Sequence, residues 1–169
     1  GEHDILLFSS AGKSIRFKES DVRSVGRTAI GVRGIRLADK DKVVSLIVAE
    51  SDDPILTATE KGYGKRTQLD EYRAQARGGS GVISIKTSDR NGQVVGAIQV
   101  TDEDEMMLIS DKGTLVRARA ADVSIIGRNT QGVTLINIAD DETLVSVAKI
   151  AETDEEEEGA EEVGLTSKE

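Results

Sequence analysis

The length, composition and charge of this chain exclude several classes of protein. Its 169 residues contain no cysteine and one histidine, His3, which rules out disulfide scaffolds, Cys-type zinc sites, thiol catalysis and His-based triads. Aromatic residues make up 2% of the chain, too few for a single-strand binder that stacks bases on aromatic side chains. The net charge of -9, taken as a whole, argues against a nucleic-acid partner as well.

No segment predicts a membrane span or a secretory signal. The longest apolar run, residues 43–49, is interrupted by Ser45 and is far shorter than the about 20 residues that a span needs. We therefore expect no membrane partner, and the missing cysteines fit a reducing cytoplasm. Because the chain starts with Gly1 and not with Met, we expect a fragment or a processed chain.

Short β-strands separated by turns are predicted from the N-terminus to residue 151. The apolar runs are rich in β-branched residues, and no helical 3.6-residue stripe is present. Turns are marked by Gly12, Gly62 and Gly113 and by the hairpin dipeptide Asn91-Gly92. The predicted strands include residues 5–8, 14–18, 43–48, 94–100, 106–109 and 144–150.

An internal repeat organises these strands. The three turn glycines stand 50 and 51 residues apart, and an arginine follows each after four residues. A second arginine stands four residues before a Gly-Val pair in every copy. The first set is Arg16, Arg66 and Arg117, and the second set is Arg27, Arg77 and Arg128. This period predicts an all-β, propeller-like array of about three four-stranded blades, over residues 4–53, 54–104 and 105–151.

The negative charge is concentrated at the C-terminal end. Residues 152–169 contain nine acidic residues against Lys168. Residues 1–50 and 51–100 have net charges of +2 and +1, and residues 101–150 have a net charge of -4. The composition of residues 152–169 predicts a disordered acidic tail, for which a solubilising end without a further role is the alternative.

Basic residues recur at equivalent places in the repeats. Strand residues two apart share a face, so Arg117 and Arg119 point the same way, as do Arg16 and Lys18. Repeated blades would set equivalent arginines in a stripe on the outer surface, which suits a DNA backbone that bends around the domain. Ordinary surface charge balanced by local acids is the alternative. The candidate DNA-binding residues are Lys13, Arg16, Lys18, Arg27, Arg33, Arg36, Lys65, Arg66, Arg73, Arg77, Lys112, Arg117, Arg119 and Arg128.

Motifs for catalysis or metal binding are weak. Two G-x-x-x-x-G strings, at residues 26–31 and 127–132, are followed by valine instead of the Lys-Ser/Thr of a phosphate-binding loop. The carboxylate runs lie in turn-like linkers, where such clusters are usually solvated. Tyr63 and Tyr72 are interpreted as core or rim packing. We therefore predict no catalytic residue and no metal ligand.

Particular strings in the repeats carry a family resemblance. They are Gly-Val-Arg-Gly-Ile-Arg-Leu at residues 31–37, Asp-Lys-Val-Val-Ser-Leu-Ile at residues 41–47, and further strings at residues 62–67, 81–86 and 127–133. These strings resemble the C-terminal domain of bacterial DNA gyrase A subunits, closest to the proteobacterial type. The resemblance covers nearly the whole chain, and the acidic end also fits it.

The resemblance implies a β-pinwheel that binds double-stranded DNA on its outer rim and wraps it, so that the holoenzyme introduces negative supercoils with ATP. The implied partners are DNA, the rest of the gyrase A protein and the gyrase B protein in an A2B2 holoenzyme, with no small-molecule substrate. ATP and Mg would be used elsewhere in that holoenzyme, and this chain would hold no cofactor. The implied location is the bacterial cytoplasm, on the nucleoid.

The chain departs from the family at its hallmark motif. The gyrase-A box, Gln-Arg-Arg-Gly-Gly-Arg/Lys-Gly, has no full copy here, and the nearest string, Gln-Ala-Arg-Gly-Gly-Ser-Gly at residues 75–81, lacks two basic positions. Residues 25–31 and 126–132 fill the equivalent slots less well. Each slot is interpreted as a degenerate box whose one arginine contacts phosphate. Since the family domain usually has six blades with the box in the first, three blades imply its C-terminal half.

Two other functions stay open at this point. The C-terminal domain of topoisomerase IV has similar blades and lacks the full box. A protein-interaction propeller without a DNA role belongs to a different class. For the acidic tail, the resemblance favours modulation of DNA binding by competition with DNA for the basic rim.

Overall fold

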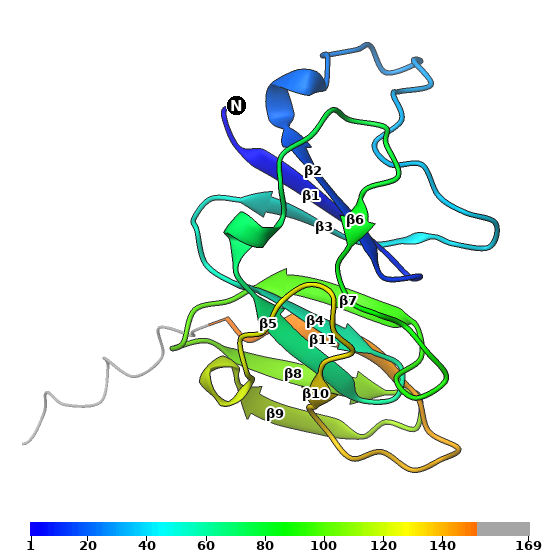
Figure 1. Ribbon diagram of the computed structural model, residues 1–169, viewed down its shortest axis with the longest axis vertical. Helices are drawn as coiled ribbons and strands as arrows, with labels where there is room; N and C mark the ends of the chain where they lie inside the picture. Colours follow the sequence, from blue (N-terminus) through cyan, green and yellow to red (C-terminus); the bar gives the residue numbers. More distant parts are fainter. Residues whose placement is uncertain (152–169) are drawn as a thin grey trace, which may run out of the picture.

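Each repeat begins with a tight β-hairpin that ends in a single turn of 3-10 helix. In the computed structural model, which describes residues 1–151, the turn glycines of the repeat close these hairpins (Figure 1). The predicted tail over residues 152–169 lies outside the described residues. The hairpins are β1 (Asp4–Ser9) with β2 (Lys13–Lys18), β4 (Ile55–Thr59) with β5 (Tyr63–Thr67), and β8 (Glu105–Ser110) with β9 (Leu115–Arg119). The 3-10 turns are η1 (Glu19–Asp21), η2 (Leu69–Glu71) and η3 (Ala120–Asp122).

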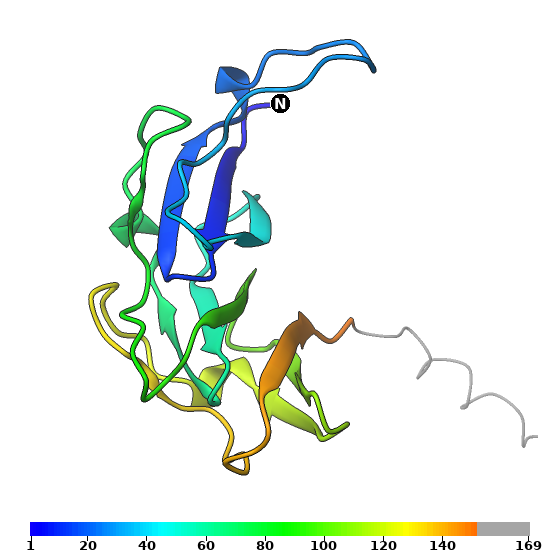
Figure 2. The ribbon, with the colours of Figure 1, turned by 90° about the vertical axis from the view of Figure 1, so that its right-hand side faces the viewer.

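A third strand from the same repeat completes the inner side of each sheet. The chain leaves the hairpin through a long loop and returns antiparallel to the first hairpin strand. The returning strands are β3 (Val43–Ala49), β7 (Val94–Gln99) and β11 (Leu144–Lys149). Strand β7 contacts both β3 and β11, so the three returning strands lie together on one side of the array (Figure 2).

The fourth strand of a sheet comes from the next repeat. Strand β6 (Val82–Ile83) pairs with β2, and strand β10 (Val133–Thr134) pairs with β5. The sheet orders are β3-β1-β2-β6, β10-β5-β4-β7 and β11-β8-β9. The predicted all-β propeller-like architecture is confirmed. The prediction of a self-contained four-stranded blade was wrong, because the first two sheets borrow an outer strand and the third has three strands within residues 1–151.

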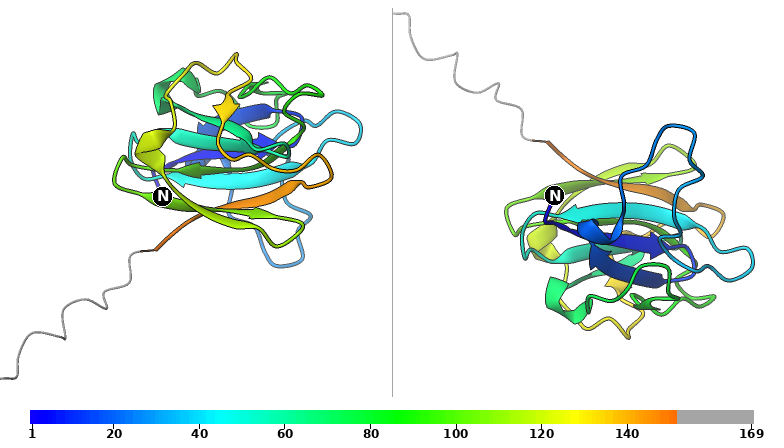
Figure 3. Two further views of the ribbon diagram at one scale, coloured as in Figure 1. Left: turned by 90° about the horizontal axis from the view of Figure 1, so that it is seen from below. Right: turned by 90° about the horizontal axis from the view of Figure 1, so that it is seen from above.

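Alternation along the strands places apolar side chains on both faces of a sheet. Leu6 and Phe8 point from β1 toward the second sheet, where Phe8 meets Tyr72 edge to face with ring centroids 5.7 Å apart. Leu56 on β4 packs with Met106 and other residues of the third sheet. The core is therefore divided between the joints of neighbouring sheets, which stack face to face along the array (Figure 3). No helix within residues 1–151 is long and apolar enough to cross a membrane.

The borrowed strand approaches its host sheet closely at Gly81. This glycine has φ +73°, and a Cβ atom there would overlap the backbone oxygen of Ser14. The equivalent Gly31 has φ +89° with no atom within 4 Å of its would-be Cβ atom. The two positions thus share the left-handed backbone and differ in the space beside it.

We predict that Gly81→Ala destabilises the protein more than its matched control, Gly31→Ala. The control carries only the cost of an alanine in the left-handed region, about 1 kcal/mol. Gly81→Ala also pushes β6 off β2, which we expect to cost about 2 kcal/mol more. Urea unfolding followed by far-ultraviolet circular dichroism measures both. Equal losses would contradict the close approach of the borrowed strand.

Candidate nucleic-acid interface

The first set of repeat arginines joins neighbouring sheets. Arg16 Nε donates to Asp4 Oδ2 at 2.7 Å, and its Nη1 donates to the carbonyl oxygens of Leu69 at 3.0 Å and Tyr72 at 3.2 Å. These carbonyls belong to the 3-10 turn of the next sheet. Burial alone would raise the pKa of Asp4, but hydrogen bonds from Lys18 and Arg16 outweigh it and lower that pKa.

Arg66 makes the same contact between the second and third sheets. Its Nε donates to the Val123 carbonyl oxygen at 2.8 Å and its Nη1 pairs with Asp102 Oδ1 at 2.5 Å. Arg66 is 5% exposed, so its predicted place on the outer surface was wrong. The physical reason is that β5 turns this side chain toward the third sheet, whose turn carbonyls need a donor.

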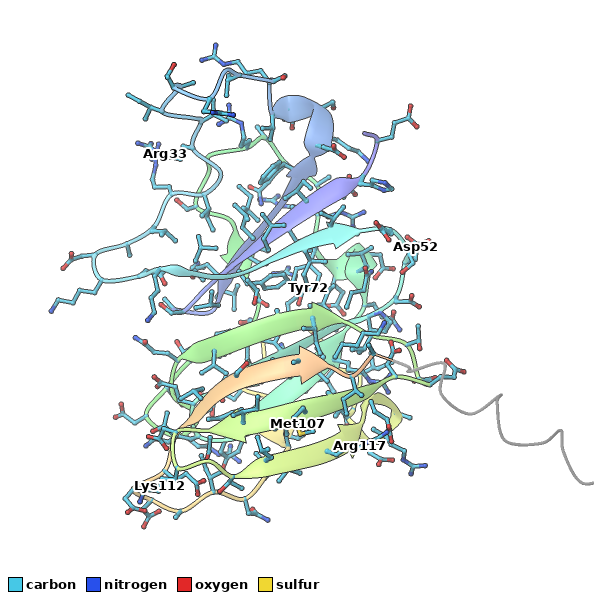
Figure 4. All side chains as sticks on the ribbon, turned by 180° about the vertical axis from the view of Figure 1, so that it is seen from behind. Arg33, Asp52, Tyr72, Met107, Lys112 and Arg117 are labelled. Atoms are coloured by element: carbon cyan, nitrogen blue, oxygen red, sulfur yellow. The ribbon has the colours of Figure 1, made fainter. Side chains whose placement is uncertain are left out.

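Arg117 occupies the same repeat position in the third sheet with no following sheet within residues 1–151. Its side chain is 62% exposed and pairs with Glu105 on the neighbouring strand (Figure 4). One sequence pattern therefore gives two buried inter-sheet arginines and one surface arginine. The presence or absence of the next sheet decides between them.

The second set of repeat arginines reaches back to the preceding repeat. Arg77 Nη1 donates to the carbonyl oxygen of Arg33, and its Nε donates to that of Asp21 at 3.2 Å. Arg128 Nη1 donates to the carbonyl oxygen of Ile83 at 2.7 Å. Arg33 and Ile83 are equivalent repeat positions, so the contact recurs. The guanidinium groups of two degenerate boxes are thus engaged within the array, which leaves them less free for phosphate.

Lys65 is buried in the joint between the second and third sheets. Its Nζ donates to the carbonyl oxygens of Gly127 and Arg128, both at 2.6 Å, and to Thr130 Oγ1 at 3.0 Å. Burial lowers the pKa of Lys65 to about 8, against a raising effect of Glu71. Its predicted exposure on the rim was wrong, because the side chain is fully buried and holds the loop of the third repeat.

Most of the basic residues on the strands and hairpin turns are neutralised by nearby carboxylates. Lys18 pairs with Asp4 at 2.7 Å and Arg119 with Asp122 at 3.1 Å, and Lys112 pairs with Asp141. Lys13 is exposed at the start of β2. The strand surfaces therefore carry paired charges, and an incoming phosphate would have to compete with those carboxylates.

Three equivalent loops, which we call the outer loops, carry basic residues without any acid. They are residues 22–36, 72–86 and 123–137, with net charges of +4, +3 and +1. In the second and third repeats they contain the borrowed strands and lie on the side of the array away from β3, β7 and β11 (Figure 2). The positive charge of the described chain is thus concentrated on these loops.

Hydrogen bonds bring successive outer loops side by side. Gly78 N donates to the Gly34 carbonyl oxygen at 2.7 Å, and Arg36 N donates to that of Gly79 at 2.8 Å. Lys86 N donates to the Thr130 carbonyl oxygen at 2.8 Å. The three loops therefore form one continuous row along the array.

Several basic residues of this row are exposed and make no ion pair with any of the residues that the structure describes. They are Arg23, Arg27, Arg33, Arg36, Arg73 and Lys86. Four of them are among the predicted candidates, and Figure 4 shows Arg33 on its loop outside the sheets. Arg23 and Lys86 were missed. The signal that could have found them is a stretch of fifteen residues, acid-free in all three repeats.

Neither tyrosine has the setting of a nucleophile. Tyr72 is 1% exposed in the core, which confirms the packing interpretation, and burial raises its pKa. Tyr63 lies beneath the Arg90 guanidinium, 5.0 Å from its carbon to the ring centroid. Residues 1–151 contain no cluster of three or more His, Asp or Glu side chains that could hold a metal ion.

Comparison with known families identifies the class of protein. The family model described as "DNA gyrase C-terminal domain, beta-propeller" matches residues 3–50, 53–101 and 104–151. The chain belongs to this family, and each match corresponds to one repeat.

Relatives that are similar over almost the whole chain are DNA gyrase A subunits. The chain is 59% identical over 158 residues to the DNA gyrase A protein of Klebsiella oxytoca and 57% identical to that of Escherichia coli (strain K12). Each alignment covers 94% of this chain and 18% of the relative, so the chain spans about a fifth of the length of these relatives.

Solved structures agree with the fold. A structure titled "Structure of DNA gyrase A C-terminal domain" superimposes with a TM-score of 0.83 at 31% identity, over 89% of this chain and 51% of that one. The C-terminal domain of DNA topoisomerase IV gives the same TM-score at 26% identity, over 89% and 47%. The resemblance seen in the sequence is confirmed.

We predict that Arg66→Met destabilises the protein far more than Arg117→Met, although both arginines hold the same repeat position. Loss of the buried inter-sheet arginine leaves turn carbonyls without a donor, at a cost of about 3 kcal/mol. Loss of the exposed ion pair is expected to cost about 0.5 kcal/mol or less. Thermal unfolding in calorimetry compares them, and similar losses would contradict the joint described above.

We also predict a pH-dependent contribution from Lys65. Its folded-state pKa of about 8 lies below the ordinary value of 10.5, so between these pH values the unfolded chain binds more protons than the folded one. The free energy of unfolding of the wild type, relative to Lys65→Met, therefore rises as the pH increases through this window. Urea titrations at several pH values measure the difference. A difference that stays flat would show that burial leaves this ammonium unperturbed.

Proposed function

We propose that this chain is a duplex-binding and DNA-bending module of a DNA gyrase A subunit. It binds the DNA backbone without sequence preference along the outer loops, and in an A2B2 holoenzyme it supports ATP-dependent negative supercoiling by wrapping DNA. It performs no chemistry itself, since the cleavage and ATP sites of such a holoenzyme would lie on other segments. The observation that carries the proposal is the acid-free row of unpaired basic residues.

The chemistry of the row suits phosphate and not bases. Arginine and lysine neutralise phosphates whatever the base sequence, and the guanidinium fork matches phosphate oxygens. The only aromatic residue of the outer loops, Tyr72, is buried between sheets and has no face to offer a base. A duplex read through its backbone is therefore the substrate that this row fits best.

The arrangement of the loops favours bending. Successive loops sit on successive sheets, which are stacked along an arc, so a duplex that follows the row must curve with it (Figure 2). Because the loop charges fall from +4 to +1 along the chain, we expect the strongest contact at the first repeat and a weaker one at the third. Bending is sustained where backbone contacts offset the elastic cost of the duplex.

Two other functions are less well supported. The fold matches topoisomerase IV as well as gyrase A, but the identities of 57–59% are to gyrase A subunits over almost the whole chain. A protein-interaction propeller does not require an outer edge free of acids over three equivalent loops. Binding to a long duplex that is absent with an acidic protein surface distinguishes DNA recognition from general affinity for anions.

We predict that Arg36→Ala, Arg73→Ala and Lys86→Ala in one chain weaken duplex binding strongly. The three residues are exposed members of the row without a carboxylate partner among residues 1–151. The slope of log K against log salt is expected to fall by about 0.9 for each phosphate that is no longer neutralised. Fluorescence anisotropy with a labelled duplex, repeated over a range of salt concentrations, measures affinity and slope.

The matched control removes the same charge from the strand surface. A chain with Lys112→Ala, Arg117→Ala and Arg119→Ala loses three cations that are already paired with carboxylates. It should keep nearly the wild-type affinity and slope. Equal weakening of the two triple variants would mean that net charge alone, and not the row, determines binding.

The acidic segment is proposed to modulate this binding. Residues 152–169 carry a net charge of -8, and eighteen residues reach at most about 60 Å when extended, enough to meet the outer loops from the end of β11. Competition of tethered carboxylates with phosphate lowers the apparent affinity for DNA, most at low salt.

We predict that deleting residues 152–169 tightens duplex binding at low salt and has little effect at high salt. A chain of full length with every tail Glu and Asp replaced by Gln and Asn controls for bulk, and it should behave like the deletion. Anisotropy titrations of the three proteins measure the effect. If all three bind DNA with one affinity, the tail has no part in binding.

A further inference from the structure

The joint between neighbouring sheets has three parts that occur twice in this chain. A two-residue strand of the later repeat pairs with the second hairpin strand of the earlier sheet. A hairpin arginine, Arg16 or Arg66, reaches forward to the carbonyls of the next 3-10 turn. A loop arginine, Arg77 or Arg128, reaches back to a carbonyl in the loop of the repeat before it.

The third sheet presents one half of such a joint with no partner among residues 1–151. Strand β9 has a free outer edge, whereas β2 and β5 are each paired on that side. Arg117, the equivalent of Arg16 and Arg66, is exposed. Leu115 beside it is 61% exposed, and Met107 is only half-buried on the same face (Figure 4). We call this face the acceptor end.

The first repeat presents the other half. Val32 and Arg33 stand where β6 and β10 stand in the later repeats, yet they pair with no strand within the described chain. Val22 is 43% exposed, whereas its equivalents Tyr72 and Val123 are 1% and 5% exposed inside joints. Arg27, the equivalent of the back-reaching arginines, is exposed. We call this face the donor end.

We propose that the donor end of one chain docks on the acceptor end of a second copy and builds a third joint of the same kind. Val32 and Arg33 of one copy pair with the edge of β9 in the other, around Leu115. Arg117 donates to the carbonyls of Glu19 and Val22, and Arg27 donates to that of Thr134, the equivalent of Ile83. This inference uses the faces of the sheets, and it does not depend on the proposed DNA binding.

The charges at the two ends favour this occupant. Where the existing joints have Leu69 and Ala120, the donor end has Glu19, a carboxylate on the very turn that Arg117 would reach. A contact between two different surfaces is heterologous, so copies either close into a ring or continue as a chain of copies. Extended edges also pair readily with a strand of matching register, which the two existing joints show for this sequence.

The test is the mass of the 169-residue chain in solution without DNA. Sedimentation equilibrium from low concentration to roughly 0.5 mM, a binding free energy of about 4.5 kcal/mol, should show masses rising above the 18.1 kDa monomer. Val32→Pro removes the backbone donor of the docking strand, and Arg117→Ala removes the forward-reaching arginine. Each should raise the dissociation constant at least about tenfold.

Two controls keep the chemistry matched. Val32→Thr retains the N–H group and the β-branched shape, and Arg119→Ala removes an arginine of the same strand that lies outside the joint. Both should associate like the wild type. Circular dichroism of all four variants verifies that they are folded, and the wild-type result is decisive without them.

A mixing experiment tests the head-to-tail arrangement itself. Val32→Pro keeps its acceptor end and Arg117→Ala keeps its donor end, so an equimolar mixture should form dimers and nothing larger. A wild type that stays at 18.1 kDa over the whole range would overturn the proposal. So would association that Val32→Pro and Arg117→Ala leave unchanged, or a mixture that remains monomeric.

Discussion

The structure depends on one contact, the arginine that crosses from a hairpin to the 3-10 turn of the next sheet. A three- or four-stranded sheet of this size has two apolar faces and cannot stand alone in water. Arg16 and Arg66 satisfy turn carbonyls that would otherwise be buried without donors. The borrowed strand adds backbone pairing to the same joint, so packing, hydrogen bonding and chain connectivity all hold neighbouring sheets together.

This joint sorts the basic residues of the chain by what they can do. Arginines that face a following sheet become internal parts, as Arg66 does. Basic residues on open strand surfaces find carboxylates on adjacent strands and turns, as Arg117 finds Glu105. Only the outer loops, which contain no acid, keep cations available for a phosphate backbone. A net charge of -9 is therefore compatible with a DNA-binding edge, because charge of opposite sign is segregated along the chain.

The repeat predicted the architecture well. Constant spacing of turn glycines and alternation of apolar residues are local signals, so strands such as residues 43–49 and 94–99 were found almost to the residue. The borrowed strands escaped prediction because two residues are too few to show a period. A sequence repeat also does not say which of its copies lends a strand to which sheet.

Predicting the interface from the sequence was less successful, for a physical reason. Spacing identified Arg66 and Arg117 as equivalent, but burial of a side chain depends on what is packed against it. Lys65 stands where the other repeats have Ile15 and Val116, and the sequence offered no sign that loop carbonyls of the third repeat would accept its protons. The absence of acids from three equivalent loops, in contrast, was legible in the sequence and gives a sounder criterion than repeated arginines.

The most direct measurement of the central claim is arginine modification with phenylglyoxal, read by mass spectrometry with and without a long duplex. The outer-loop arginines Arg33, Arg36 and Arg73 should react in the free protein and be protected by DNA. Arg119 should react equally in both states, and the buried Arg66 should react in neither. Protection of Arg119 with no change at the outer loops would contradict the account and place the DNA on the strand surface.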